Sequence, residues 1–158
     1  RVRAEGILTS MQMKPLRTSA AYRHLHSTRF PPWLRNGGSL VQVGEWGCAL
    51  SHCDYWQHVV LAYRPALIFE DDIALSIQPS QAREMIDATV KKYTDADIIF
   101  LGHWKKFLTT HAYYVTPNGA KRLLQECRPA SFHIPTPIDR YVKKLCETGE
   151  VRCAQNTS

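Results

Sequence analysis

Three consecutive carboxylates, Glu70-Asp71-Asp72, directly follow a short apolar run, Ala66–Phe69. Such a run is typical of a buried strand, and ligand sites in α/β proteins lie beyond the carboxyl ends of strands. Carboxylates this close repel one another unless water or a cation separates their charges. In extended backbone Glu70 and Asp72 would point to the same side. Two carboxylates on one side suit a hard divalent ion that holds a phosphate.

The acidic tripeptide also has a simpler interpretation, as a solvated turn after the strand, because aspartates favour turns. The net charge of +6 would attract a phosphate-bearing ligand, a nucleic acid or an anionic membrane surface. The basic residues are scattered rather than gathered in a run, which favours a solvated surface over a nucleic-acid module. We therefore expect no nucleic-acid partner.

The length of 158 residues, with 44% hydrophobic and 22% charged residues, fits a single globular domain over residues 1–158. No stretch reaches the roughly 18 apolar residues of a membrane span, so we expect no transmembrane segment in this chain. None of the five cysteines forms a CxxC pair, which argues against a structural zinc site. Cys48 and Cys53 are poorly spaced for a disulfide on a helix, and Cys53 and Cys127 are predicted to be core residues.

Alternating helical and extended patterns predict an α/β fold that positions these residues. The predicted strands are Ala66–Phe69, Asp97–Leu101 and Ala112–Val115. The predicted helices cover Gly44–Ala62, Ala82–Tyr93 and two segments that begin at Thr116-Pro117 and Thr136-Pro137, since Thr is a good cap and Pro suits the first helical position.

The remaining segments are predicted to be mostly irregular. Residues 1–43 read as loops with a short helix near Ala20–His26, and Ser39–Val43 is either a short strand or the approach to the next helix. Ser76–Pro79 is predicted to be a loop. Gly149 is placed to close the last helix, because glycine readily adopts the left-handed conformation that ends helices.

Six distinctive segments occur in an order and spacing that resemble glycosyltransferase family 25, which includes bacterial lipooligosaccharide galactosyltransferases and collagen galactosyltransferases. The resemblance runs from about Val2 to about Leu145 and is thin before Gly44. In chain order the segments are Gly44–His52, Leu67–Asp72, Phe100–Gly102, His111–Val115, Gly119–Leu124 and Pro137–Asp139.

The resemblance implies a GT-A type, Rossmann-like fold and inverting transfer of a sugar from a UDP-sugar, commonly UDP-galactose, to a glycan or protein hydroxyl. It also implies a divalent cation, usually Mn²⁺, at the motif Glu70-Asp71-Asp72. We expect Asp72 to be a direct ligand, and Glu70 or Asp71 to contact the metal, its waters or the ribose of the donor. The cation would stabilise charge on the leaving nucleotide diphosphate.

An inverting transfer needs a base for the acceptor hydroxyl, and Asp139 is the candidate. Its alternative is a capping-box acid three residues after Thr136. His111 could be a further metal ligand or touch the donor phosphates, or be a surface histidine at a strand edge. His52 could line the sugar site, or pack beside Trp56 on the flank of its helix.

One departure from the family concerns Arg1–Gly6, which resembles either the second strand of the family's first strand-helix-strand unit or the segment just after that strand. The chain would then lack much of that unit, which helps to hold the nucleotide base. A non-catalytic or truncated glycosyltransferase-like binding domain is therefore the alternative function. By resemblance, a bacterial enzyme would work at the cytoplasmic face of the membrane, and a collagen-type enzyme in the endoplasmic reticulum lumen.

Overall fold

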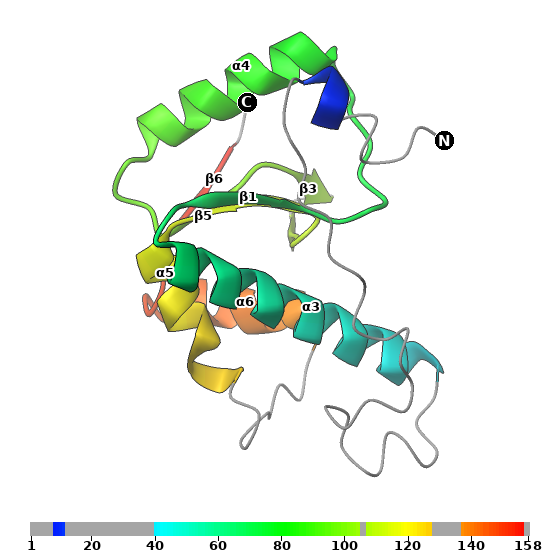
Figure 1. Ribbon diagram of the computed structural model, residues 1–158, viewed down its shortest axis with the longest axis vertical. Coiled ribbons are helices and arrows are strands. Elements are labelled where there is room, and N and C mark those ends of the chain that lie inside the picture. The colour runs from blue at the N-terminus through cyan, green and yellow to red at the C-terminus, as the bar shows by residue number, and fades with distance from the viewer. Residues whose placement is uncertain (1–7, 12–39, 105–106, 128–136, 157–158) are drawn as a thin grey trace.

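The computed structural model describes residues 8–11, 40–104, 107–127 and 137–156 (Figure 1). Its centre is a four-stranded sheet with the strand order β1-β5-β2-β6. A separate two-stranded hairpin pairs β3 (His103–Trp104) with β4 (Phe107–Leu108). The strands of the main sheet are β1 (Ala66–Phe69), β2 (Ile98–Phe100), β5 (Ala112–Val115) and β6 (Cys153–Gln155).

Strand β5 runs antiparallel to both of its neighbours, β1 and β2, while β6 runs parallel to β2. Phe69 pairs with Ala112 in the register of β1 and β5. The carboxyl end of β1 therefore lies beside the amino end of β5. The next pair continues this contact, because the Glu70 N–H donates a hydrogen bond of 2.9 Å to the carbonyl of His111.

Helices cover both faces of the sheet, with α4 on one side and α3, α5 and α6 on the other (Figure 1). This layered arrangement confirms the predicted α/β class. A short 3₁₀ turn, η2 (Leu124–Glu126), continues α5. The helices are α3 (Leu40–Ala62), α4 (Pro79–Lys92), α5 (Pro117–Leu123) and α6 (Ile138–Glu147).

Two hydrophobic clusters form because successive strand residues point to opposite faces of the sheet. Ile68 and Tyr113 belong to the larger cluster, together with Trp56 on α3. Leu67 and Phe69 pack instead with the smaller cluster around α4. Residues 70 and 72, just beyond β1, thus emerge from a strand that is packed on both faces.

The helix boundaries differ from the predicted ones at three amino-terminal ends. α3 begins at Leu40 rather than Gly44, so the possible strand over Ser39–Val43 is wrong from Leu40 onward. Ser39 and the predicted helix Ala20–His26 lie outside the described residues. α4 begins at Pro79, which the sequence analysis placed in a loop, because proline fits the first turn of a helix, where its missing N–H has no partner to lose.

Two predicted helix ends are confirmed. Thr116 caps α5, and its hydroxyl accepts a hydrogen bond of 3.1 Å from the Gly119 N–H. Gly149 has a φ of +75° just after α6, the left-handed conformation expected there.

The start of α6 differs from the prediction. Its cap is Pro137 and not Thr136, so Asp139 is the second helical residue, whereas a capping box needs its acid at the third. Thr136 itself lies outside the described residues.

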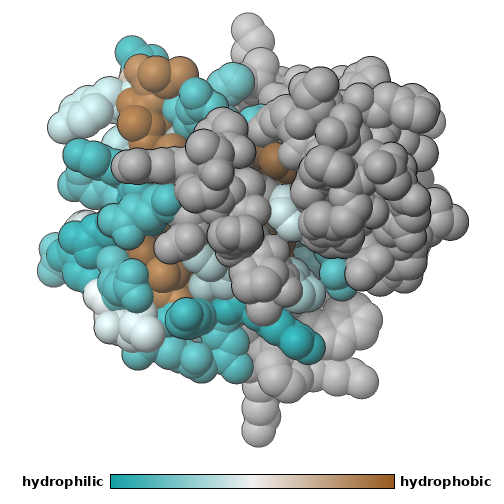
Figure 2. All heavy atoms as spheres, turned by 90° about the horizontal axis from the view of Figure 1, so that it is seen from below, coloured by the Kyte–Doolittle hydropathy of each residue, from teal (hydrophilic) through white to brown (hydrophobic). Residues whose placement is uncertain are grey.

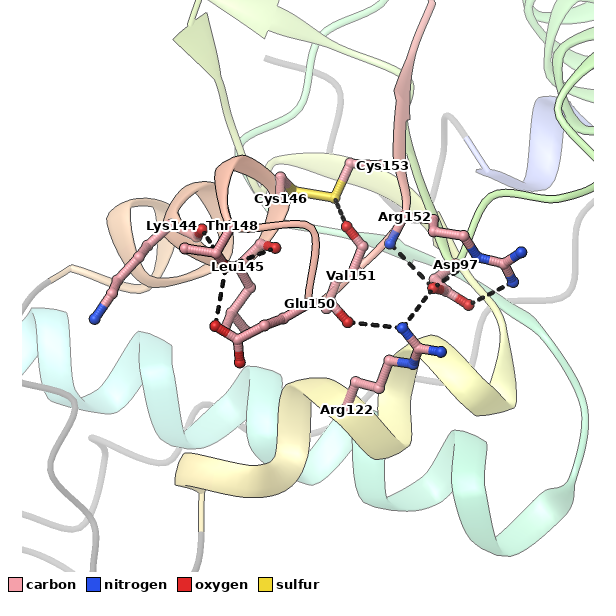
Figure 3. The surroundings of a disulfide bond; sticks show 10 residues. All are labelled: Asp97, Arg122, Lys144, Leu145, Cys146, Thr148, Glu150, Val151, Arg152 and Cys153. Carbon is pink, nitrogen blue, oxygen red and sulfur yellow. Dashed lines mark hydrogen bonds and ion pairs between the residues drawn. A yellow bond between two sulfur atoms is a disulfide. The ribbon is translucent and has the colours of Figure 1, made fainter.

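The strand β6 and the β3–β4 hairpin were not predicted, and β2 is shorter than the predicted Asp97–Leu101. A charge cluster around Asp97 attaches β6 to β2 (Figure 3). The Asp97 carboxylate is 1% exposed and accepts from the Arg152 backbone N–H at 3.0 Å and from its guanidinium at 3.3 Å. Arg122 on α5 lies 3.6 Å from the same carboxylate. Charged hydrogen bonds thus hold β6 against β2, and the sequence of β6 lacks the hydrophobic pattern by which a strand is recognised.

Four of the five cysteines form disulfides. Cys53 is a core residue and Cys127 packs against the core, as predicted, but the bond between them was not predicted. Cys53 on α3 is bonded to Cys127, 74 residues away, and Cys146 on α6 is bonded to Cys153 on β6 (Figure 3). Cys48 is free, as the poor spacing from Cys53 predicted. The two bonds tie α3 to the end of η2 and α6 to the sheet edge.

The described surface is mostly hydrophilic on the face seen in Figure 2, with small, separate hydrophobic areas. The large hydrophobic side chains most exposed among the described residues are Leu61, Tyr63 and Ile77. None of the described helices combines the length and the apolar character needed to cross a bilayer.

Asp97→Asn should lower the free energy of unfolding by about 2 kcal/mol near neutral pH, since it weakens charged hydrogen bonds to a buried carboxylate. Burial alone would raise the pKa of Asp97, but the hydrogen bonds and charges of Arg152 and Arg122 outweigh it and lower the pKa. The stabilisation is therefore present above the ordinary carboxyl pKa and is lost as pH falls through the lowered value.

Urea unfolding of both proteins between about pH 7 and about pH 3 measures this effect. The stability difference should shrink toward low pH. Asp87→Asn is the matched control, because its carboxylate pairs with Arg83 on the exposed side of α4 and should contribute less than about 1 kcal/mol. A stability difference that is the same at both ends of the pH range would contradict the proposed charge effect.

Candidate functional site

Glu70 is the centre of a polar cluster at the edge of the sheet where β1 ends and β5 begins. One carboxylate oxygen, Oε1, lies 3.3 Å from Nε2 of His52 and accepts a 2.9 Å hydrogen bond from the Thr110 hydroxyl. The other oxygen, Oε2, lies 3.1 Å from Nδ1 of His111. Three elements thus meet at one half-buried carboxylate, namely α3, the end of β1 and the turn before β5.

A buried chain of hydrogen bonds fixes His52 behind Glu70. The Trp56 indole N–H donates to the Tyr113 hydroxyl at 2.9 Å, and that hydroxyl lies 2.8 Å from Nδ1 of His52. Because the indole is only a donor and the carboxylate only an acceptor, the neutral tautomer with its proton on Nε2 satisfies every partner. Tyr113 then donates to His52, and His52 donates to Glu70.

This arrangement places His52 differently from a residue that lines a surface site. The His52 side chain is 2% exposed, and its ring stacks on Tyr113 with centroids 5.7 Å apart. It also lies 6.0 Å from the Trp56 ring, which fits the alternative of packing beside that residue. Its polar contact is with Glu70, so His52 can orient that carboxylate from behind.

The electrostatics favour an ionised Glu70. Burial by itself would raise the pKa of this carboxyl group, because it penalises the charged form. Hydrogen bonds from His52 and Thr110 to the carboxylate act against burial, and protonation of His52 or His111 would add to their effect; the net result is a lowered pKa. Glu70 therefore presents a negative charge at neutral pH.

Asp139 reaches the same cluster from the first turn of α6. Its Oδ1 accepts hydrogen bonds from the Thr110 hydroxyl and from the Thr110 backbone N–H, the latter at 3.2 Å. Since Thr110 also contacts Glu70, one threonine joins the two carboxylates. Asp139 lies in a half-buried position beside the acidic motif, where an acid or base could act.

Glu70, Asp72 and His111 offer three ligand atoms within 4.8 Å of one another. The His111 Nδ1 atom is buried and, although it lies 3.1 Å from Glu70, it makes no hydrogen bond with any described residue. An imidazole nitrogen that faces a carboxylate oxygen needs either a proton of its own or a cation that both atoms can bind. Two carboxylates and an imidazole are ligands that suit Mn²⁺, so the donor set fits such an ion.

Asp72 joins this group by a different route from the predicted one. Residues 71 and 72 form a turn rather than extended backbone, so the prediction that residues 70 and 72 project like alternate strand residues is wrong. Both aspartates are exposed, as the turn interpretation expected. Asp72 nevertheless lies near Glu70 and His111, whereas Asp71 belongs to neither of the possible ligand groups among the described residues.

A second possible ligand group, Cys48, His52 and Glu70, is less suitable for a metal ion. An ion on Nε2 of His52 would move the ring proton to Nδ1. The Tyr113 hydroxyl, which already accepts from Trp56, would then lose the acceptor for its own proton.

The pKa of the Cys48 thiol in that group is raised by its surroundings. Burial, followed by the charges of Glu70, Asp139 and Asp72, raises the pKa of Cys48 to about 12. The thiol is therefore protonated at neutral pH and is a poor nucleophile. The same carboxylates that disfavour a thiolate favour a cation in their neighbourhood.

The fold brings together five of the six residues selected from the sequence, namely Glu70, Asp72, His52, His111 and Asp139. Sequence analysis missed Thr110 and Tyr113. Tyr113 carried a partial signal, since a tyrosine hydroxyl buried in a strand needs a partner, but Tyr114 in the same strand carried it equally. Thr110 carried none, because its contacts depend on the register between β1 and β5.

The profile of glycosyltransferase family 25, described as LPS biosynthesis protein, matches residues 15–108, more than half of the chain. The chain therefore belongs to glycosyltransferase family 25, which confirms the resemblance drawn from its motifs. Membership of this family implies a sugar donor and a glycan acceptor.

No curated protein and no solved structure matches the chain. The family match includes His52 and the motif Glu70-Asp71-Asp72 but ends before Thr110, His111 and Asp139. His111 and Asp139 had been selected from their own sequence segments, so only Thr110 enters the site through the fold alone.

Proposed function

We propose that this chain is a metal-dependent, inverting glycosyltransferase domain of GT-A type that transfers galactose from UDP-galactose to a glycan or protein hydroxyl. The observation that carries the proposal is the meeting of Glu70, Asp72, His111 and Asp139 at one edge of the sheet. Family membership supports sugar transfer, and the donor set supports a divalent ion. The inferred base, Asp139, lies on the neighbouring helix α6.

Transfer in this proposal is a single displacement at the anomeric carbon of the donor. The acceptor hydroxyl oxygen forms a bond to that carbon, and the bond to the UDP oxygen breaks, so UDP leaves with the electron pair. Asp139 accepts the proton of the acceptor hydroxyl. Thr110 holds Oδ1 of Asp139, which leaves the other carboxylate oxygen as the proton acceptor.

Mn²⁺, when bound, would stabilise the negative charge that develops on the leaving diphosphate. Glu70, Asp72 and His111 are the residues that would hold it. His52 keeps Glu70 oriented, because its Nε2–H donates to Oε1 and leaves Oε2 facing His111. Asp71, exposed in the adjacent turn, is proposed to contact the ribose or the waters of the ion.

Asp72→Asn and His111→Gln should each weaken Mn²⁺ binding by about tenfold or more, since each removes a ligand. Titration calorimetry, or the electron paramagnetic resonance signal of free Mn²⁺, measures this directly. Asp87→Asn is the control, since it makes the same chemical change at an exposed carboxylate on α4 that belongs to neither ligand group, and it should bind Mn²⁺ within about threefold of wild type. Equal losses in all three variants would point to general electrostatic attraction instead of this ligand set.

Asp139→Asn should lower kcat for galactose transfer by roughly 10²- to 10⁴-fold while Mn²⁺ and UDP-galactose still bind, because a general base acts in the chemical step. Release of UDP in the presence of a mixed panel of glycan and hydroxylysine-containing peptide acceptors measures the transfer. An Asp139→Asn variant as active as wild type would exclude Asp139 as the base.

A non-catalytic or truncated binding domain is the alternative, and the same experiment distinguishes it. Binding of UDP-galactose with Mn²⁺, but without transfer to any acceptor, would favour a binding domain. Folded protein that binds neither Mn²⁺ nor UDP-galactose would overturn the proposed function.

The disulfides support a second part of the proposal, that the chain works in an oxidising compartment such as the endoplasmic reticulum lumen. Disulfides persist in such compartments and are rare in the cytosol. Cys53–Cys127 closes a loop of 74 residues. A loop of this length should stabilise the fold by about 4 kcal/mol in the chain-entropy model.

Alkylation of the protein as it comes from its native source, followed by mass spectrometry, should label Cys48 only after unfolding and should label no other cysteine before reduction. Reduction should lower the midpoint of urea unfolding, because both cross-links are lost. Labelling of all five cysteines without reduction would show that the protein works in a reducing compartment.

A further inference from the structure

We propose that Thr110 is a positioning residue that couples the candidate base to the candidate metal-binding carboxylate. The inference rests on the proposed function and adds a residue that neither the motif nor the family match includes. The Thr110 hydroxyl contacts Oε1 of Glu70 and Oδ1 of Asp139, and its backbone N–H donates to the same Asp139 oxygen.

The hydrogen-bond count explains why both donors of Thr110 are needed. A hydroxyl has one proton, so at any moment it donates to only one of the two carboxylates. When it donates to Glu70, the backbone N–H still holds Asp139. Thr110 can therefore keep Asp139 in place while it stabilises the charge on Glu70. Both donors belong to one residue, so the distance between the two carboxylates is set by the backbone of Thr110.

Thr110 is itself fixed firmly enough to position others. The residue is 1% exposed and lies in the turn that leads into β5. Hydrogen bonds from the chain beyond both neighbouring strands hold the two residues that follow Thr110, from the Glu70 N–H to the His111 carbonyl and from the Leu101 N–H to the Ala112 carbonyl. The hydroxyl therefore projects from a part of the sheet that the register of three strands determines.

The two carboxylates need such a connection because they come from separate elements. Glu70 follows β1 and is oriented by His52 on α3, whereas Asp139 belongs to α6 on the same side of the sheet. Like charges repel, and within the described part of the chain Thr110 is the residue whose hydroxyl contacts both carboxylates. Core packing and the Cys146–Cys153 disulfide hold α6 against the sheet, and Thr110 adds the hydrogen bonds that set Asp139 relative to Glu70.

Thr110→Val tests the proposal, because valine keeps the shape of threonine and replaces the hydroxyl with a methyl group. We expect kcat to fall by about 10²-fold, the loss associated with a small misplacement of reacting groups. We expect Mn²⁺ affinity to fall as well, since Glu70 loses a donor. Thr110→Ser, which keeps both donors, should recover kcat to within about fivefold of wild type.

Thr109→Val is the matched control, a neighbouring threonine that is 8% exposed and has no side-chain contact with either carboxylate among the described residues. It should leave kcat and Mn²⁺ affinity within about twofold of wild type. If Thr110→Val does not fold, Thr110→Ala replaces it, since alanine loses the same hydroxyl without placing a methyl group between the charges.

A double variant tests whether Thr110 acts through Asp139 or only stabilises the fold. Adding Thr110→Val to Asp139→Asn should lower kcat by less than about threefold beyond Asp139→Asn alone, because residues that act as a unit are not additive. Multiplicative losses, or a folded Thr110→Val enzyme with wild-type kcat, would overturn the inference. A wild-type chain without transfer activity would instead overturn the proposed function, and loss of Mn²⁺ affinity in Thr110→Val would still test the contact with Glu70.

Discussion

The antiparallel register of β1 and β5 is the constraint on which the site depends. Phe69 pairs with Ala112, and the Glu70 N–H donates to the carbonyl of His111. This register places Thr110 and His111 beside Glu70 although they are forty residues apart in the chain. A slip of one residue would turn these side chains to the opposite faces of the sheet. Packing of Ile68 and Tyr113 into the larger hydrophobic cluster prevents that slip, so the core and the site are fixed by the same pairing.

Hydrophobic patterning predicted the parts of the fold that hydrophobic burial stabilises. Ala66–Phe69 and Ala112–Val115 were located to the residue, because short apolar runs bounded by turn residues favour strands over helices. The start of α3 was missed because the apolar residues of Leu40–Val43 resemble a strand as much as a helix. β6 was missed because Cys153–Gln155 has no strand pattern and is attached through Arg152 and Asp97, which are 55 residues apart.

The same distinction applies to the site. Residues with a recognisable local pattern could be selected from the sequence, whereas contacts between distant segments could not. Glu70 and Asp72 could be selected because their side-chain chemistry and their position after a strand are both visible locally. His52 was selected from its motif, but its buried contacts with Tyr113 and Glu70 arise only in the fold. Thr110 could not be selected, since threonine before a strand is ordinary and its two carboxylate partners lie 40 and 29 residues away.

A comparison of the carboxylates of Asp97 and Glu70 shows why the first is structural and the second suits a cation. Asp97 has two arginines as partners, so its charge is compensated within the fold. Glu70 has only His52, His111 and Thr110, and no lysine or arginine of the described residues lies within ion-pair distance of it. Asp72 and Asp139 place two further carboxylates near Glu70. Uncompensated charge at a partly exposed edge of the sheet is what a bound cation would neutralise, and the Asp97 cluster has no such need.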